Sequence, residues 1–366
     1  MAKEPFSLVW PKSLFIWEAR RVLEMPDSAI TKSVAHLLAE ATDDADAAAG
    51  FEADIGEGIG WAAPSDARDW LEGLLSDDAR LISLDQPVYY AERQGMPSGA
   101  VIEGGITGFA FEFVQLLWEM KELGYFPKAL PRGCVDTDDY DPAKVTKSIR
   151  RAVKLEITWP VEALHAWTLD EAELFSLVEY FHDAARRPRL VERWHSFGDC
   201  GPHYGDHSRE SGGVVYRWRV NDLLESYGVD LRLAATGPEK GRLVRHFSSG
   251  LDDLADAQVE ARAADVQDEV AHAIRNYRER DASLPQRRSA LALLAGALEP
   301  RRKAIGARVT LQDESDLFQI ANKFAIRHRN SQQRDDYGPE FLDWIFWNYL
   351  AMIELMEGID RRSSTP

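Results

Sequence analysis

The pattern of apolar and polar positions in the first 153 residues predicts helices joined by polar segments. Over Ile30–Ala49 the apolar residues fall on one side of a helix, and a short helix is expected over Ala67–Ser76. A long apolar run, Gly105–Gly124, predicts a helix that ends at a glycine. A further helix is expected over Pro142–Val153, because Asp141 can cap its backbone N–H groups and proline suits a first turn.

The middle of the chain mixes predicted helices and strands. β-Branched and aromatic residues over Leu155–Trp159 favour a strand. Thr168 and Glu171 have the spacing of a capping box, which predicts a helix that is ended by Pro188. The pattern then predicts a loop over Trp194–Gly213, a helix over Val214–Tyr227, and two strands, Asp230–Ala234 and Arg242–Phe247, around a Gly-Pro turn.

From Leu251 onward the pattern is helical only. Helices joined by short connections predict an antiparallel bundle. The expected helices cover residues 259–277, Leu284–Ala304, Asp313–Asn330 and Pro339–Gly358. The apolar face of the last one is assigned to Phe341, Trp344, Ile345, Met352 and Leu355.

Together these elements predict a mainly helical α+β protein, with small α/β N-terminal modules and a C-terminal bundle of four to five helices. The predicted domains are an uncharacterised α+β domain over 1–140, a small module over 141–248, the helical bundle over 249–360, and a disordered tail over 361–366.

The composition is that of a folded globular protein. Hydrophobic residues make up 45% of the 366 residues, and 11 Trp, 11 Tyr and 15 Phe can bury a large apolar area, which excludes disorder as the main state. Six of the tryptophans are expected in the core rather than as platforms for nucleic-acid bases: Trp159, Trp167, Trp194, Trp218, Trp344 and Trp347.

The net charge of −18, from 61 acidic and 43 basic residues, disfavours nucleic acids and anionic membranes as general partners. A nucleic-acid activity would need a local cluster of cations. Two cysteines, Cys134 and Cys200, exclude a disulfide scaffold and favour a reducing compartment. Prolines and charges interrupt Met1–Leu23, and no run of about 18 apolar residues occurs, so we expect a cytoplasmic protein with no membrane partner.

One basic cluster lies in the predicted third bundle helix. Between Arg301 and Asp336, eight basic residues against five acidic ones give a local charge of +3. His328 extends the apolar stripe of this helix, with Arg327 beside it. A histidine can act as general acid or base towards a ribose hydroxyl, and arginine can stabilise a phosphate. RNA supplies its own 2′-hydroxyl nucleophile, so such a site would need no metal or other cofactor.

The roles that this chemistry suggests are as follows: His328 as general acid or base, Arg327 and Arg329 as phosphate ligands, Asn330 as an orienting residue, and Arg334 and Lys323 as RNA-binding residues. The alternative is structural. His328 would then cap the helix or fill a polar core site, and the arginines would be surface residues placed favourably at a helix C-terminus.

A second cluster contains four residues that could bind zinc. His195, Cys200, His203 and His207 fall within thirteen residues, with C-x2-H and H-x3-H spacings that a tetrahedral site accepts. The same segment is also compatible with a hydrogen-bonded structural or recognition loop. The sequence therefore leaves open both a zinc ion and no cofactor at all.

Several segments resemble a family of bacterial defence proteins. Leu174–Tyr180, His195–Tyr204 (HSFGDCGPHY) and Val215–Leu224 resemble the small N-terminal module of AbiJ-type abortive-infection proteins, over about residues 150–248. Phe324–Tyr337 and Trp344–Ala351 resemble the HEPN-type helical domain attached to such modules, over about 250–358. The first 130 or so residues carry no such resemblance.

The resemblance implies a phage-defence or toxin-like effector whose HEPN bundle forms a homodimer and cleaves RNA without a metal, with an antitoxin or trigger protein as a further partner. Many HEPN ribonucleases use an arginine followed four to six residues later by a histidine. Here no histidine follows His328. The alternatives are therefore a variant ribonuclease site, a non-catalytic dimerisation or interaction protein, and a zinc-stabilised sensor module.

Overall fold

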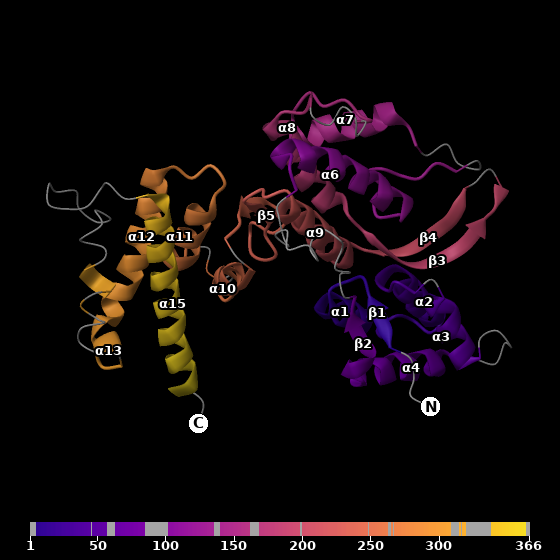
Figure 1. The fold of residues 1–366 in the computed structure, drawn as a ribbon, viewed down its shortest axis with the longest axis horizontal. Helices are drawn as coiled ribbons and strands as arrows, with labels where there is room; N and C mark the ends of the chain where they lie inside the picture. The colour runs from indigo at the N-terminus through magenta and orange to yellow at the C-terminus, as the bar shows by residue number, and fades with distance from the viewer. Residues whose placement is uncertain are drawn as a thin grey trace, which may run out of the picture. The chain divides into compact units, whose positions relative to one another are not determined.

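The computed structural model confirms a mainly helical α+β fold with small sheets (Figure 1). Of the residues that it describes, 63% are helical and 11% lie in strands. It divides into two compact units, Met1–Gly228 and Val229–Pro366. The residues that the structure describes are 5–44, 46–56, 63–84, 102–134, 140–161, 168–197, 200–247, 249–262, 265, 267–308, 315, 317–319 and 338–363.

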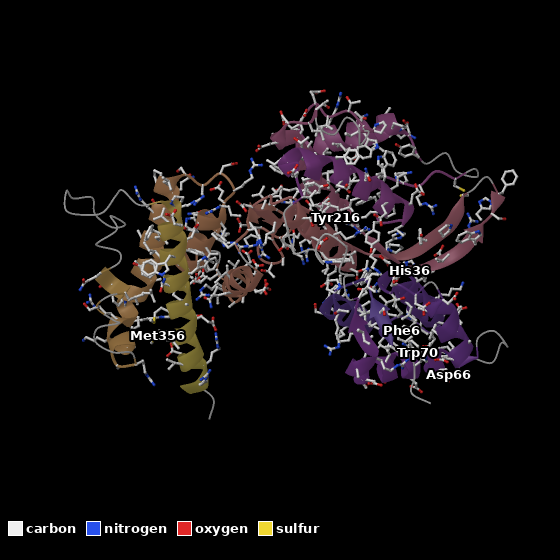
Figure 2. All side chains as sticks on the ribbon, viewed as in Figure 1. Phe6, His36, Asp66, Trp70, Tyr216 and Met356 are labelled. Carbon is white, nitrogen blue, oxygen red and sulfur yellow. The ribbon has the colours of Figure 1, made fainter. Side chains whose placement is uncertain are left out.

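The first unit combines helices with two small sheets. Its elements are β1 (Phe6–Leu8), α1 (Lys12–Val22), α2 (Ile30–Ala41), α3 (Ala47–Ile55), α4 (Pro64–Ser76), β2 (Leu81–Ser83), α6 (Gly105–Glu122), α7 (Pro142–Val153), α8 (Glu171–Ala184), β3 (Arg187–His195), β4 (Gly201–Ser208) and α9 (Arg209–Ser226). Strands β1 and β2 pair in parallel, and α1–α4 form the crossover between them. Phe6 of β1 packs edge-on against Trp70 of α4, with ring centroids 5.7 Å apart (Figure 2).

A buried ion network ties β3 to the N-terminal helices. The Arg187 side chain is fully buried, and its guanidinium donates to Glu18 Oε1 of α1 at 3.0 Å and to Glu40 Oε2 of α2 at 2.9 Å. The Tyr125 hydroxyl, just beyond α6, donates to Glu40 as well. Burial and the neighbouring Glu40 carboxylate raise the pKa of Tyr125 well above its ordinary value. Paired charges of this kind fix the strand relative to α1 and α2, because an unpaired charge could not remain buried.

The close packing of β3 on α9 explains why position 212 is a glycine. A Cβ at Gly212 would lie 2.6 Å from backbone atoms of Arg186 and Arg187, closer than real Cβ contacts. Helix α9 also starts at Arg209 rather than at the predicted Val214, because the Ser208 side chain accepts a hydrogen bond from the Ser211 backbone N–H. The helix N-terminus therefore directly follows β4.

Three local predictions were wrong in this unit. The segment predicted as a loop over Trp194–Gly213 contains the end of β3, all of β4 and the start of α9. Leu155–Trp159 is not a strand, because side chains of α7 satisfy its backbone: Arg150 donates to the Ile157 carbonyl, and Thr146 bonds both backbone groups of Trp159.

The third wrong prediction concerns the cap of α8. The capping residues are Asp170 and Glu173, two positions later than the predicted Thr168 and Glu171. The cap of α7 by Asp141 is confirmed, since its carboxylate accepts from the Ala143 backbone N–H at 2.9 Å.

The second unit joins one short hairpin to a set of helices. Its elements are β5 (Leu231–Leu233), β6 (Leu243–Arg245), α10 (Ser249–Glu260), α11 (Glu269–Arg278), α12 (Leu284–Leu298), α13 (Arg302–Gly306) and α15 (Pro339–Ser363). Strands β5 and β6 pair antiparallel, as predicted. The core includes Tyr277 of α11 stacked on Phe346 of α15, with ring centroids 4.2 Å apart.

The division of the chain differs from the predicted boundaries at 141 and 249. Residues 141–228 belong with the N-terminal helices, and the Arg187 network shows why. The hairpin β5–β6 belongs with the bundle, because Arg232 of β5 pairs with Asp256 of α10, and Arg278 of α11 donates to the same carboxylate. The predicted disordered tail also differs, since α15 continues through Ser363.

The buried face of α15 is not the predicted one. Of the five residues assigned to it, Ile345 is buried and Met352 packs partly buried against the core, whereas Phe341, Trp344 and Leu355 are exposed. The helix instead buries Leu342, Phe346, Tyr349, Leu350, Ile353 and Met356, the last of which is labelled in Figure 2.

The six tryptophans that were expected in the core also differ in burial. Trp159 is buried as expected, but Trp194 is exposed. Trp167 lies outside the described residues. To span a bilayer a helix must be both long and continuously apolar, and none within the described ranges is.

Candidate metal centre

Four side chains that can bind a metal lie close together at the loop end of the β3–β4 hairpin. The thiols of Cys134 and Cys200 and the imidazoles of His195 and His203 each offer one ligand atom, and these four atoms lie within 4.8 Å of one another. Cys134 comes from the segment that follows α6, and the other three come from the hairpin. Three of the four residues predicted as zinc ligands are therefore brought together.

The pairing of the strands places the two histidines on one face. His195, the last residue of β3, lies opposite Gly201, the first residue of β4. His203 follows Gly201 by two positions, and side chains two residues apart point to the same face of a strand. The imidazoles are thus diagonal neighbours, with ring centroids 5.7 Å apart.

Arg132 holds the segment with Cys134 against the hairpin. Its guanidinium donates to the Pro202 carbonyl at 2.6 Å, to the Cys200 carbonyl at 3.2 Å, and to Glu122 Oε2 at 3.1 Å. Burial opposes ionisation of Glu122, but Lys121 and Arg132 outweigh it and hold the pKa of this carboxyl below its ordinary value. Arg132 thus joins α6, the segment after it and β4.

The distances between sulfur and nitrogen atoms match those of a tetrahedral metal site. Cys134 Sγ lies 3.8 Å from His195 Nδ1 and 3.7 Å from His203 Nε2, and Cys200 Sγ lies 3.4 Å from His203 Nε2. Metal–ligand bonds of about 2.3 Å to sulfur and about 2.05 Å to nitrogen, at tetrahedral angles, separate S and N atoms by about 3.6 Å. A single ion between the four atoms would therefore require only small shifts.

His207, the fourth predicted ligand, is not part of this cluster. It lies four residues beyond His203 on β4, roughly 13 Å along an extended strand. Its position in the register is opposite Pro188, near the start of β3. Burial lowers the pKa of His207, which favours a neutral imidazole there. Cys134 takes its place as the fourth member of the cluster.

Sequence reasoning missed Cys134 because it lies 61 residues before His195. Short-range spacing could not find it. One signal was present: Cys134 is the only other thiol in the chain, and soft metals favour thiolate ligands.

A small cavity lies beside the cluster. Its volume is about 160 Å³, and both sulfurs, His203 and Tyr204 line it together with apolar residues of the segment after α6. The thiols differ in burial, since Cys200 is 8% exposed and Cys134 is half-buried. Neither forms a disulfide.

Two aromatic side chains that flank His195 in the sequence face solvent. Trp194 is 70% and Phe197 is 74% exposed, the highest values for large apolar side chains among the described residues. The expectation that Trp194 lies in the core is therefore wrong. Exposed aromatic residues are typical of surfaces that bind a partner.

The second set of predicted site residues cannot be placed. His328, Arg327, Arg329, Asn330, Arg334 and Lys323 all lie in 320–337, outside the described residues.

Comparison of the chain with models of protein families, with curated proteins and with solved structures found no match. The resemblance to AbiJ-type proteins and HEPN domains stays a prediction.

Proposed function

We propose that the first unit is a zinc-stabilised recognition module, in which Cys134, His195, Cys200 and His203 bind one zinc ion. The convergence of these four ligand atoms within 4.8 Å supports the proposal. Two thiolates and two imidazoles in a tetrahedron form a set that zinc favours over magnesium and calcium, which prefer oxygen ligands. Because four protein ligands fill the coordination sphere, the ion is structural and has no open position for a substrate.

The ion would connect two parts of the chain that the fold alone holds weakly. It joins the segment after α6 to the end of the hairpin, where β3 becomes exposed from Glu192 onward. Trp194 and Phe197 would thereby be held on a fixed backbone. A rigid pair of exposed aromatic residues loses little conformational entropy when it binds a partner, so this end of the hairpin is the proposed recognition surface.

The metal content of the purified full-length chain tests this proposal. We expect one zinc ion per chain by elemental analysis, and none after Cys134→Ser or His195→Ala. His207→Ala is the matched control, since it removes a histidine from the same hairpin but not from the cluster, and it should keep the ion. Cobalt substitution should produce the visible absorption bands of a tetrahedral site with two thiolates.

Equal zinc content in all variants would contradict the assignment of these ligands. The absence of zinc, cobalt and nickel from the reduced wild-type chain after incubation with each metal would refute the metal site itself.

The alternative function, a metal-independent ribonuclease with His328 as general acid or base, remains a separate hypothesis. It concerns the second unit and residues outside the described ranges. Both can hold in one chain, because a recognition module can precede an effector domain.

A further inference from the structure

We propose that Cys134 and Cys200 are a site of reversible oxidation, in which a peroxide converts the two thiolates to a disulfide and the metal is released. This inference rests on the proposed zinc site. It adds a modification, and a chemical class of oxidant, to residues that are otherwise structural.

The proximity of the sulfurs is the first argument. Their separation is at most 4.8 Å, against about 2.05 Å in a disulfide. A change between staggered rotamers moves a cysteine sulfur by about 3 Å, so side-chain rotation can close the gap. The segment with Cys134 and the start of β4, which directly follows Cys200, are already held together by Arg132, which favours bond formation within one chain.

Access is the second argument. The cavity of about 160 Å³ is lined by both cysteines, and a peroxide is small enough to enter it. Cys134 is the more exposed of the two thiols, so it is the one expected to react first. No other cysteine exists in the chain, so each sulfur has only the other as an intramolecular partner.

The reaction balances in two steps with hydrogen peroxide. The Cys134 thiolate attacks one peroxide oxygen, the O–O bond breaks, and a sulfenic acid and a hydroxide ion form. The Cys200 thiolate then attacks the sulfenic sulfur, the S–O bond breaks, and the disulfide and a second hydroxide form. The two sulfurs lose two electrons in total and the peroxide oxygens gain them, and both hydroxides take up protons to become water.

The consequence is loss of the metal, because a disulfide sulfur is a poor ligand and two imidazoles alone bind zinc weakly. The disulfide keeps the segment after α6 joined to β4. His195, however, loses the metal that ties it to Cys134, and with it a constraint on Trp194 and Phe197. Oxidation would therefore alter the proposed recognition surface without unfolding the unit.

The test uses the zinc-loaded full-length chain, treated with a small excess of hydrogen peroxide in the presence of a zinc-sensitive dye. We expect release of one zinc ion per chain, loss of two thiols, and a peptide pair linked through Cys134 and Cys200 in mass spectra. Dithiothreitol followed by zinc should restore the starting state. His195→Ala keeps both thiols but lacks a ligand, so it should form the same disulfide without releasing metal, whereas His207→Ala should behave as wild type.

The outcomes separate this inference from the proposed function. A zinc-loaded chain that keeps its metal under peroxide, or whose thiols become sulfinic acids or disulfides between chains, overturns the inference alone. A reduced chain that binds no zinc overturns the proposed function, and it also overturns the part of this inference that concerns metal release.

Discussion

The buried ion network around Arg187 offers a direct test of how the hairpin is attached to the first unit. Arg187→Met keeps much of the side-chain volume and its contact with Trp10, over whose ring the guanidinium lies at 5.1 Å. It removes the cation nearest to the buried Glu18 and Glu40 carboxylates, although Arg189 Nε still lies 3.9 Å from Glu18 Oε1. Removal of one partner from a buried ion pair costs about 3–5 kcal/mol. For a unit of this size, about 2–4 °C per kcal/mol corresponds to a decrease in Tm of roughly 6–20 °C.

Thermal unfolding followed by circular dichroism measures this change. Arg193→Met is the matched control, because Arg193 lies on the exposed part of the same strand, and it should change stability by less than about 0.5 kcal/mol. Adding Glu18→Gln and Glu40→Gln to Arg187→Met should recover part of the loss, since the unpaired charges are then removed. If Arg187→Met lost less than about 1 kcal/mol, or if the added substitutions lowered stability further, the reasoning about an uncompensated buried charge would be refuted.

Three further predictions address pH, metal and activity. Burial, with a smaller effect from Arg187, lowers the pKa of His36 to about 4, so between pH 4 and 6.5 the unfolded chain binds a proton that the folded chain does not. The free energy of unfolding should therefore fall by up to ~3 kcal/mol as the pH decreases from about 6.5 to about 4. His36→Phe should flatten this part of the pH profile, as measured by urea unfolding. A zinc chelator should accelerate amide hydrogen exchange at Arg193–His195 and leave exchange at Arg187–Arg189 unchanged; equal acceleration at both places would argue against a local role for the ion. RNA cleavage that persists in EDTA and is lost in His328→Ala would support the ribonuclease hypothesis, and equal cleavage by both proteins would exclude His328 from catalysis.

Local signals predicted much of the fold because their physical causes are local. The cap at Asp141 and the turn between β5 and β6 depend on residues a few positions apart, and both were predicted correctly. The β3–β4 hairpin was missed because its strands mix charged residues, histidines, glycines and prolines, so no regular apolar alternation marks them. The buried face of α15 was misassigned for a related reason. A helix with apolar residues on several sides has no single face that its own sequence selects, and only the packing of α11 and α12 against it decides.

For the candidate site, too, closeness in sequence decided which residues were predicted. His195, Cys200 and His203 were identified because they lie close in sequence, and His207 was included for the same reason although the strand carries it away from the others. Cys134 was missed because its proximity is created by the fold. Spacing within one segment can therefore suggest a metal site, but a site that joins two segments is completed only by their packing.

The course of burial along β3 explains why a metal would be needed where the four ligands meet. The strand begins with the buried residues Arg187 and Pro188, and it becomes exposed from Glu192 onward. Its first part is held by ion pairs inside the core, whereas its last part has little apolar area to bury and must be held in another way. Side-chain hydrogen bonds from Arg132 contribute there, but each such bond has a net value of only about 1 kcal/mol. Four metal–ligand bonds supply a far larger free energy than these hydrogen bonds and need no core, so this is the point of the hairpin at which loss of the ion should have its greatest effect.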